Sequence, residues 1–312
     1  MGADELFDAI VIGAGPAGLT AALYLARYRR RTLVLHDGTS RALRIPRSHN
    51  VAGFPDGVTG PELIARMTEH AARYGASFET VHIDSVRREA GAFELSGDGR
   101  AWRSRALILA TGVALNEVAL DPDAHQLAIE AGVLRYCPIC DGFEASDKTI
   151  GVLGCGANGA AEALFLRQYS PQITLMPLVA SELTSAQIQE LTEAGVTVER
   201  GALQGLAWDL SRIAVALEGR AAELSFGVLY PALGCAPRTE LAAQLGVQMT
   251  PEGFPPPDAP RETNVPGLFF AGDVVEGLDQ VNVATGQGSV AATCVHNWLR
   301  AQDHETLEAR AD

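Results

Sequence analysis

The sequence has few cysteines and too few basic residues to balance its acidic ones. Its 312 residues include five cysteines, an odd and low number that argues against the disulfide framework of a secreted protein. Lys and Arg together number 24 against 38 Asp and Glu, which gives a formal net charge of -14. Such a chain lacks the positive surface that binds nucleic acid or an anionic membrane.

Long apolar runs are missing as well. No stretch of about 18 uncharged apolar residues occurs, so no transmembrane helix is expected. The first residues, Met1 to Glu5, contain no basic segment followed by an apolar one, so no signal peptide is expected either. At about 150 residues per domain, the length predicts two domains. Because neither a signal peptide nor a transmembrane helix is expected, a cytoplasmic protein is predicted.

One pattern occurs twice in the chain. Residues 7–12 are a short apolar run, followed by a glycine-rich turn, a helical segment at 16–30 and a second apolar run at 32–35. The same order returns from residue 149, with a strand, a glycine turn, a helix at 160–169 and a further strand. The duplicated unit predicts an α/β protein with two Rossmann-like dinucleotide-binding domains, each built on a parallel sheet.

Other local patterns lie between the two units. Residues 41–60 are rich in Pro, Gly and Asn and are predicted to form a loop. A helix is predicted from Pro61 to Gly75, because Pro suits the first helical position and the pattern that follows is amphipathic. Gly-Asp-Gly at 97–99 predicts a hairpin between two strands.

The first glycine turn has the spacing of a dinucleotide site. Gly13-Ala14-Gly15-Pro16-Ala17-Gly18 fits G-x-G-x-x-G, directly after a strand and at the start of a helix. The first glycine permits the tight turn, the second lets the backbone approach a pyrophosphate, and the third lets the helix pack close to the sheet. The positive end of the helix then binds the pyrophosphate.

The residue that would hold the ribose is less clearly marked. An acidic residue is typical at the end of the second strand, but position 36 is His and position 37 is Asp. Either His36 or Asp37 is a candidate for the ribose contact. The alternative is that His36 is a surface loop residue without a ligand.

Cys137 and Cys140 form a C-x-x-C pair. A structural zinc site needs four ligands, and the sequence has no second C-x-x-C and no His-x-x-x-His, so no metal site is predicted. The other cysteines, Cys155, Cys235 and Cys294, are isolated. The short spacing lets the two sulfurs meet, which favours a reversible disulfide, with two buried free thiols as the alternative.

These motifs together resemble the low-molecular-weight thioredoxin reductases, which are FAD-dependent pyridine nucleotide-disulfide oxidoreductases. The resemblance extends over nearly the whole chain, and its motifs occur in the family's order. They are the turn at 13–18, the loop at 50–55, the segment at 59–63, Ala110-Thr111-Gly112, the pair at 137–142, the turn at 154–159, the segment at 233–239, Ala271-Gly272-Asp273, and Gln280 with Gly286 and Gly288.

The resemblance implies an FAD domain split by an inserted NAD(P)-type domain that carries the C-x-x-C pair. The first part of the FAD domain would span 1–118, the central domain 119–240 and the second part 241–312. It also implies a homodimer that acts on a protein or small-molecule disulfide such as a thioredoxin.

The resemblance also implies roles for single residues. Cys140 would lie nearest the flavin, Cys137 would attack the external disulfide, and Asp141 would move the thiol proton. Asp273 would contact the ribitol and phosphate of FAD, Asn50 would lie near the flavin, and Gln280 near its pyrimidine end. The complete implied FAD site is Gly13, Gly15, Pro16, Ala17, Gly18, His36, Asp37, Asn50, Ala110, Thr111, Gly112, Gly272, Asp273, Gln280 and Val281.

The second glycine turn departs from the family. Gly154, Gly156, Asn158 and Gly159 have the backbone pattern of a nucleotide site. The family's basic stretch for the 2′-phosphate of NADPH is replaced by the segment 177–182, and no Arg or Lys lies between Arg167 and Glu190. Because that phosphate carries about two negative charges, NADPH is disfavoured as the occupant of this site. No acidic residue ends the preceding strand to hold an NAD ribose either, so the sequence does not mark an ordinary NAD(P)H site.

Three hypotheses follow from this departure. The first is a disulfide reductase that passes electrons between flavin and the Cys137–Cys140 disulfide, with NADH, ferredoxin or a second flavin bound in this site as the donor. The second is a dithiol oxidase that forms a disulfide in a small metabolite with oxygen as the acceptor. The third is a flavin-bound redox sensor without turnover.

Overall fold

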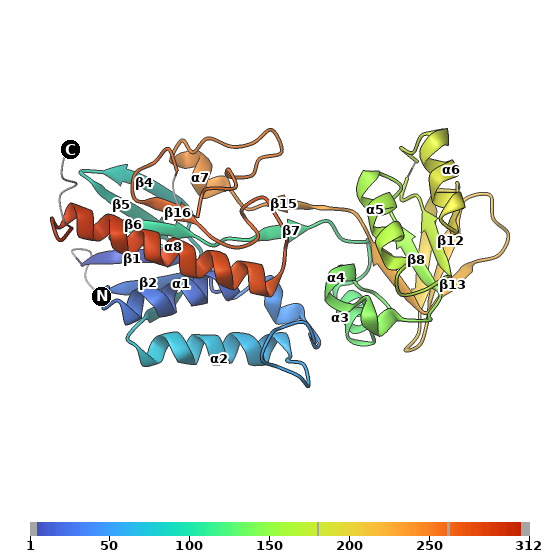
Figure 1. Ribbon diagram of the computed structural model, residues 1–312, viewed down its shortest axis with the longest axis horizontal. Helices are drawn as coiled ribbons and strands as arrows, with labels where there is room; N and C mark the ends of the chain where they lie inside the picture. The colour runs from blue at the N-terminus through green and yellow to red at the C-terminus, as the bar shows by residue number, and fades with distance from the viewer. Residues whose placement is uncertain (1–4, 180, 261–262, 307–312) are drawn as a thin grey trace, which may run out of the picture. The chain divides into compact units, whose positions relative to one another are not determined.

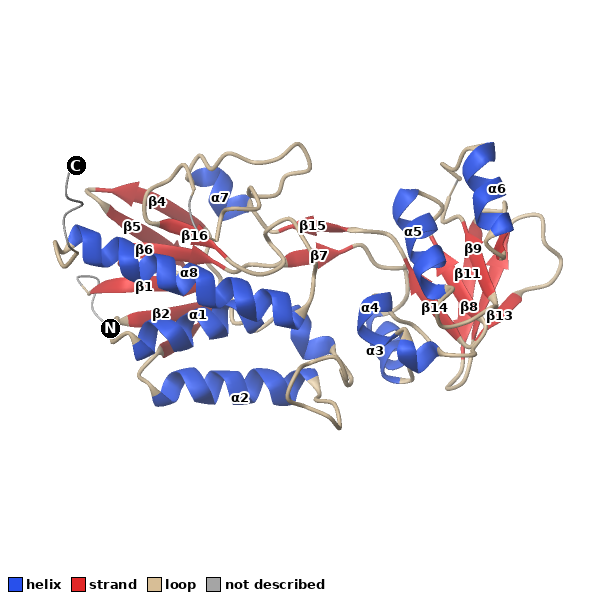
Figure 2. Ribbon diagram, viewed as in Figure 1, coloured by secondary structure: helices blue, strands red, loops and turns tan. Residues whose placement is uncertain are grey.

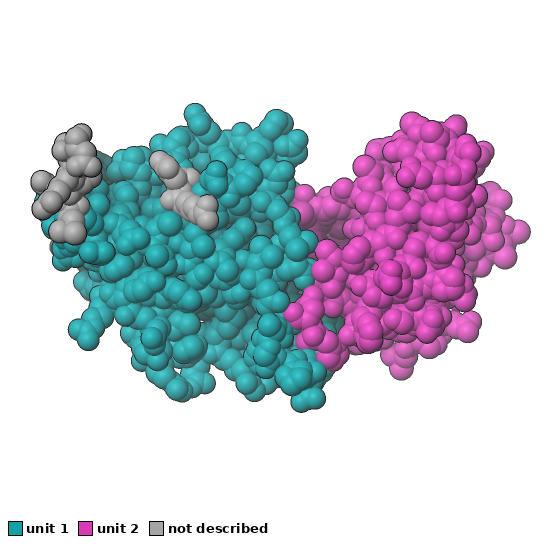
Figure 3. Space-filling view, in the orientation of Figure 1, with its two compact units in different colours: residues 1–47, 51–114, 236–312 teal, residues 48–50, 115–235 magenta. Residues whose placement is uncertain are grey.

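The computed structural model describes residues 5–179, 181–260 and 263–306. The chain forms two compact units (Figure 3). Unit 1 comprises Met1–Arg47, Val51–Ala114 and Ala236–Asp312, and unit 2 comprises Ser48–Asn50 and Leu115–Cys235. The connections between them carry β7 (Val113–Leu115) and β15 (Cys235–Pro237), which pair in a two-stranded sheet.

Unit 1 is built on one mixed sheet in the order β3-β2-β1-β6-β5-β4, with β16 also paired to β6 (Figures 1 and 2). One edge of β6 pairs along its length with β1, and its other edge is shared by β5 and β16. The strands are β1 (Leu6–Ile12), β2 (Thr32–His36), β3 (Ser77–Thr80), β4 (Ser85–Glu89), β5 (Ala92–Gly97), β6 (Arg100–Leu109) and β16 (Leu268–Phe270).

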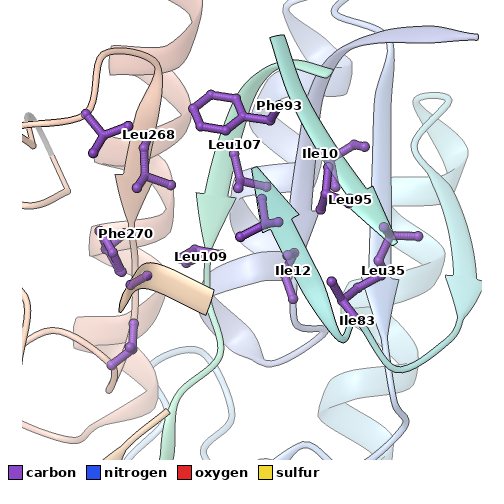
Figure 4. Close-up of a cluster of buried hydrophobic side chains, with 14 of the residues drawn as sticks. Ile10, Ile12, Leu35, Ile83, Phe93, Leu95, Leu107, Leu109, Leu268 and Phe270 are labelled. Carbon is purple, nitrogen blue, oxygen red and sulfur yellow. The ribbon is translucent and has the colours of Figure 1, made fainter. Parts of the chain in front are cut away.

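The central strands of this sheet are buried on both faces, which explains their continuous apolar sequences. On one face, Ile10, Leu107 and Phe270 belong to a large aliphatic and aromatic cluster (Figure 4). On the other face, α1 (Pro16–Arg27) and α8 (Val281–Gln302) lie over an alanine-rich cluster (Figure 1). Small side chains on this face let the helix backbones approach the strands closely.

Three short or peripheral helical elements complete unit 1 among the described residues. They are η1 (Arg41–Arg44), α2 (Gly60–Arg73) and α7 (Glu240–Gln244). α2 begins at a side-chain cap, since the hydroxyl of Thr59 accepts a hydrogen bond from the Glu62 amide. No described helix is long and apolar enough to span a membrane.

Unit 2 contains a parallel sheet in the order β10-β9-β8-β14 and an antiparallel sheet in the order β11-β12-β13. The parallel strands are β8 (Ile150–Leu153), β9 (Ile173–Met176), β10 (Val196–Val198) and β14 (Val228–Pro231). The antiparallel strands are β11 (Leu203–Trp208), β12 (Ile213–Leu217) and β13 (Leu224–Phe226). The helices are α3 (Pro122–Glu130), α4 (Pro138–Asp141), η2 (Phe143–Ala145), α5 (Ala157–Leu166) and α6 (Ser185–Glu193).

The predicted fold class is confirmed. The order β3-β2-β1-β6 in unit 1 repeats as β10-β9-β8-β14 in unit 2, and in both units a glycine turn joins the first strand to its helix. Unit 1 is interrupted by unit 2 in the sequence, as an inserted domain requires. The units divide after residue 114 and after residue 235, while the domain boundaries at 118 and 240 stay predictions.

Three predicted details were wrong. The helix predicted over 16–30 ends at Arg27, because Arg29 takes a left-handed conformation with φ of 60° that turns the chain toward β2. The helix predicted over 160–169 begins earlier, directly after the cap at Gly156. The loop predicted over 41–60 contains η1, which holds Arg41 in place.

Candidate active site

The first glycine turn, residues 13–18, is tightly packed at two of its glycines and leaves open space at the remaining one. A side chain at Gly13 would overlap the carbonyl oxygen of Ala110, and a side chain at Gly18 would overlap that of Gly13. Gly15 differs, because a Cβ there would meet only the Ser40 hydroxyl, at 3.4 Å, among the described residues. Pro16 opens α1, and no described side chain caps this helix end. The space over Gly15 therefore suits the oxygen atoms of a pyrophosphate.

His36, rather than Asp37, presents an unused polar atom beside this turn. His36 ends β2, and its buried Nδ1 has no hydrogen-bond partner among the described residues. Asp37 accepts bonds from the Thr39 amide at 2.9 Å and the Thr39 hydroxyl at 2.7 Å. Burial raises the pKa of Asp37, but these bonds outweigh it and hold the pKa below its ordinary value. A buried orphaned nitrogen fits a ribose hydroxyl as its missing partner.

The segment after β16 closes on the same turn. Gly272 has a φ of +84°, and a Cβ on it would lie 2.8 Å from the Cβ of Ala17. A side chain at Gly288, in α8, would overlap the carbonyl oxygen of Ala17. The Gly272 amide donates to Oε1 of Gln287 at 2.7 Å. The absence of side chains at Gly272 and Gly288 thus lets the loop before Asp273 and helix α8 contact the start of α1.

Asp273 is held by an arginine that the sequence did not mark. Nη2 of Arg41 lies 2.7 Å from Oδ2 of Asp273, and Nη1 of the same guanidinium lies 3.3 Å from Oδ2 of Asp279. Burial raises the pKa of Asp273 to about 6, against the opposing charge of Arg41, and Asp279 adds to the rise. One cation therefore balances two carboxylates at this position.

The remaining predicted FAD residues of unit 1 lie at strand ends and at the start of α8. The Ala110 amide donates to the Ile12 carbonyl at 2.8 Å, directly after β6. The Thr111 hydroxyl donates to the Arg238 carbonyl at 2.7 Å, and Gly112 has a φ of +69°. Gln280 is the cap residue of α8, and Val281 begins the helix. The turn at 13–18 and these segments lie at the carboxyl ends of β1, β6 and β16, where α/β sheets bind ligands.

Unit 2 carries the two cysteines as a disulfide. Cys137 is bonded to Cys140, with the Cα atoms 5.3 Å apart. Cys137 caps the one-turn helix α4, and the Cys140 amide donates to Sγ of Cys137 at 3.1 Å. An N–H group aimed at this sulfur stabilises a thiolate there once the pair is reduced.

Asp141 lies between two partners from other segments. Nη1 of Arg135 lies 2.7 Å from Oδ2 of Asp141, and the Tyr230 hydroxyl donates to Oδ1 at 2.8 Å. Burial raises the pKa of Asp141, and this exceeds the lowering effects of Arg135 and Tyr230. Tyr230 is fully buried, and its pKa is raised by burial and by the neighbouring carboxylate. A carboxyl with a raised pKa, on the residue that follows Cys140 in the sequence, is suited to donating and accepting a proton.

Asn50 belongs by its contacts to unit 2. Its Nδ2 donates to the carbonyl oxygen of Ile139, the residue between Pro138 and Cys140, at 3.3 Å. Its Oδ1 accepts a hydrogen bond from the Ser48 hydroxyl at 2.8 Å. The neighbouring His49 lies 2.8 Å from Glu144. The structure therefore places Asn50 beside the cysteine pair.

The second glycine turn has the same backbone form as the first. Gly154 has a φ of +127°, and a side chain at Gly159 would overlap the carbonyl oxygen of Gly154. Asn158 is exposed in the first turn of α5. Cys155 is buried, and burial raises the pKa of its thiol to about 11, so it is not a reactive thiolate.

Glu162, on α5, gives a pH-dependent prediction for stability. Its buried Oε2 has no hydrogen-bond partner within the described chain, and burial raises the pKa of Glu162 to about 7 from 4.5. The folded state binds this proton more tightly than the unfolded state, so stability falls as pH rises from 4.5 to 7. Glu162→Gln should raise the melting temperature by about 3–6 °C at pH 8 and by much less at pH 5.

Thermal unfolding followed by circular dichroism at the two pH values measures this difference. Glu190→Gln, an exposed carboxyl of α6, is the matched control and should shift neither temperature. An equal shift of the Glu162→Gln variant at both pH values would contradict the assignment of the effect to ionisation.

Comparison with known proteins assigns the family. The model of the family "Pyridine nucleotide-disulphide oxidoreductase" matches residues 7–288. The chain belongs to this family. It is 33% identical over 325 residues to a thioredoxin reductase of Streptomyces coelicolor, with 96% of each chain covered. This pyridine nucleotide-disulphide oxidoreductase is therefore thioredoxin reductase-like and flavin-dependent, as the sequence motifs predicted.

Two solved structures are similar along almost the whole chain. The crystal structure of HlmI has a TM-score of 0.87 and 29% identity, covering 96% of this chain and 94% of that one. The atypical thioredoxin reductase TRi from Desulfovibrio vulgaris Hildenborough has a TM-score of 0.54 and 31% identity, covering 95% of this chain and 99% of that one. This oxidoreductase thus shares its fold with both structures.

Proposed function

We propose that the chain is a thiol-disulfide oxidoreductase that passes electrons between FAD and the Cys137–Cys140 disulfide, from a donor other than NADPH. The observation that carries the proposal is the Cys137–Cys140 disulfide, followed in the sequence by Asp141, whose carboxyl contacts Arg135 and Tyr230. This carboxyl is the proposed proton carrier. FAD supplies the two-electron chemistry when bound.

The residues of unit 1 fit FAD. The open space over Gly15 suits the pyrophosphate, the orphaned Nδ1 of His36 suits a ribose hydroxyl, and Asp273 with Arg41 suits the ribitol and phosphate. We propose the remaining predicted residues of the site, including Gln280 and Asn50, as flavin contacts. The homodimer stays a prediction of the family resemblance, and the cytoplasmic location stays a prediction from the sequence.

The chain's own residues then perform the thiol chemistry. The Cys137 thiolate attacks one sulfur of the substrate disulfide, so a mixed disulfide forms and one substrate thiolate leaves. That thiolate takes a proton, and the carboxyl of Asp141 is the proposed carrier. The Cys140 thiol then gives up its proton, and its thiolate attacks Sγ of Cys137, which restores the internal disulfide. The second substrate thiolate leaves and takes the proton that Cys140 released. Two electrons and two protons thus pass from the reduced pair to the substrate.

The substrate and the donor are inferred from different features. A thioredoxin is the proposed substrate, because the relative from Streptomyces coelicolor is named a thioredoxin reductase. The donor is proposed to differ from NADPH, because no basic residue stands between Arg167 and Glu190 to pair with the 2′-phosphate.

Anaerobic mixing of the FAD-loaded protein with three donors tests the proposal. Dithiothreitol should bleach the flavin absorbance through the cysteine pair, and the reduced protein should be reoxidised by oxidised thioredoxin. Micromolar NADPH should leave the flavin oxidised on the same timescale. Rapid bleaching by NADPH would overturn the donor proposal, and failure of both dithiothreitol and thioredoxin to react would overturn the thiol-disulfide function. Oxygen consumption with dithiols measures the competing oxidase reaction.

A further inference from the structure

Glu182 lies against the glycine that a bound pyrophosphate would approach in unit 2. A Cβ built on Gly156 would have Oε2 of Glu182 as its only described neighbour within 4 Å, at 3.3 Å. The Glu182 amide donates to the carbonyl oxygen of Cys155 at 3.0 Å, so its backbone is tied to the glycine turn itself. Glu182 is an exposed residue, and one oxygen of its carboxylate therefore lies beside the space that the second glycine of this turn leaves open.

The duplicated unit supplies an internal comparison. Gly15 is the equivalent glycine in unit 1, and its nearest neighbour in that direction is the neutral hydroxyl of Ser40 at 3.4 Å. Ser40 follows β2, as Glu182 follows β9. The glycine turn of unit 1 thus faces a neutral side chain, and the glycine turn of unit 2 faces a negatively charged one.

The negative charge of Glu182 decides which ligands the second glycine turn can bind. The cap of α5 at Gly156 makes no side-chain hydrogen bond within the described residues, so the helix end is available to an anion. A carboxylate beside this glycine lies where the ligand's phosphates would approach and repels them. The described segment that follows β9 offers no basic side chain that would offset this repulsion.

We propose that Glu182 is a specificity-determining residue that excludes dinucleotides from the second glycine turn, residues 154–159. The inference rests on the proposed function and gives a reason why NADPH is not the donor. It goes further, because the pyrophosphate is common to NADPH, NADH and FAD, so all three are excluded from this turn. Electrons must then reach the flavin from a donor that does not bind here, such as a dithiol or a redox protein.

Titration calorimetry of the FAD-loaded protein with ADP-ribose tests the proposal. This probe carries the pyrophosphate without the nicotinamide or the 2′-phosphate. Glu182→Ser, which reproduces the neutral group of unit 1, should bind ADP-ribose at least about tenfold more tightly than the unchanged protein. Glu190→Gln, an exposed acidic residue of α6, should bind like the unchanged protein.

The reciprocal variant tests the same repulsion between a carboxylate and a pyrophosphate at the glycine turn of unit 1. Ser40→Glu should retain at least about tenfold less FAD after gel filtration, with an unchanged melting temperature for the protein without flavin. Glu182→Ser binding no more tightly than the unchanged protein, or micromolar binding of ADP-ribose by the unchanged protein, would overturn the proposal. Neither result depends on turnover, so a failure of the thiol-disulfide function is detected separately in the mixing experiment with thioredoxin.

Discussion

Replacing Cys140 with Ser is expected to lower disulfide turnover about a thousandfold or more while FAD stays bound. Cys137 and Cys140 form the internal disulfide, so neither thiol alone can accept two electrons from the flavin and return to the starting state. Single-turnover mixing of photoreduced protein with oxidised thioredoxin measures the loss. Cys137→Ser should show the same loss, because it removes the other sulfur of the bond.

The two variants should differ in what they trap. Cys140→Ser leaves the attacking thiol, so Cys137 should form a stable mixed disulfide with the substrate that mass spectrometry detects. Cys137→Ser should form none, because the remaining thiol is proposed to face the flavin. Cys235→Ser is the matched control, since Cys235 lies in β15, outside the Cys137–Cys140 disulfide. Turnover retained by Cys140→Ser, or equal trapping in both variants, would refute the assigned roles.

Local sequence patterns predicted the parts of the molecule that are governed by local geometry. The two glycine turns could be recognised because their glycines recur at a fixed spacing and because Gly13 and Gly154 take positive φ angles that favour glycine. The strands beside them could be recognised because they are buried on both faces and therefore uniformly apolar. The fold class followed from finding the same unit twice.

The environment of Asp141 could not be predicted in this way. Arg135 and Tyr230 meet there because the segment around Leu134 pairs with Leu229 in β14, and the Arg135 amide donates to the Leu229 carbonyl at 2.9 Å. The two partners of the carboxyl therefore come from segments far apart in sequence. No spacing rule connects them, so only the three-dimensional pairing reveals the group.

Arg41 and Glu182 show the same limit in different ways. Arg41 falls in a segment predicted as a loop, and its role appears only because η1 sets its guanidinium between Asp273 and Asp279. The sequence showed that basic residues are missing after β9, but an absence does not say what fills the space. The close approach of Glu182 to Gly156 depends on the course of the chain after the strand.

Asp141→Asn is expected to slow thiol-disulfide exchange about a hundredfold, because it removes the proposed proton carrier and keeps the side-chain shape. The raised pKa of Asp141, caused first by burial, places the acid form in a higher pH range than that of an ordinary carboxyl. A plot of exchange rate against pH should therefore contain a titration step that the Asn variant lacks. Asp147→Asn, the same substitution at an exposed position of unit 2, should leave both rate and profile unchanged.

Tyr230→Phe separates a proton-transfer role from a structural one. The hydroxyl of Tyr230 donates to Oδ1 of Asp141 at 2.8 Å and lowers the pKa of this carboxyl. Removing the hydroxyl should therefore move the titration step to higher pH, since the ionised carboxylate loses a hydrogen bond. A merely structural Asp141 would give a lower rate at every pH with no displaced step. A profile that keeps its position in Tyr230→Phe, together with an unchanged profile in Asp141→Asn, would show that another group carries the proton.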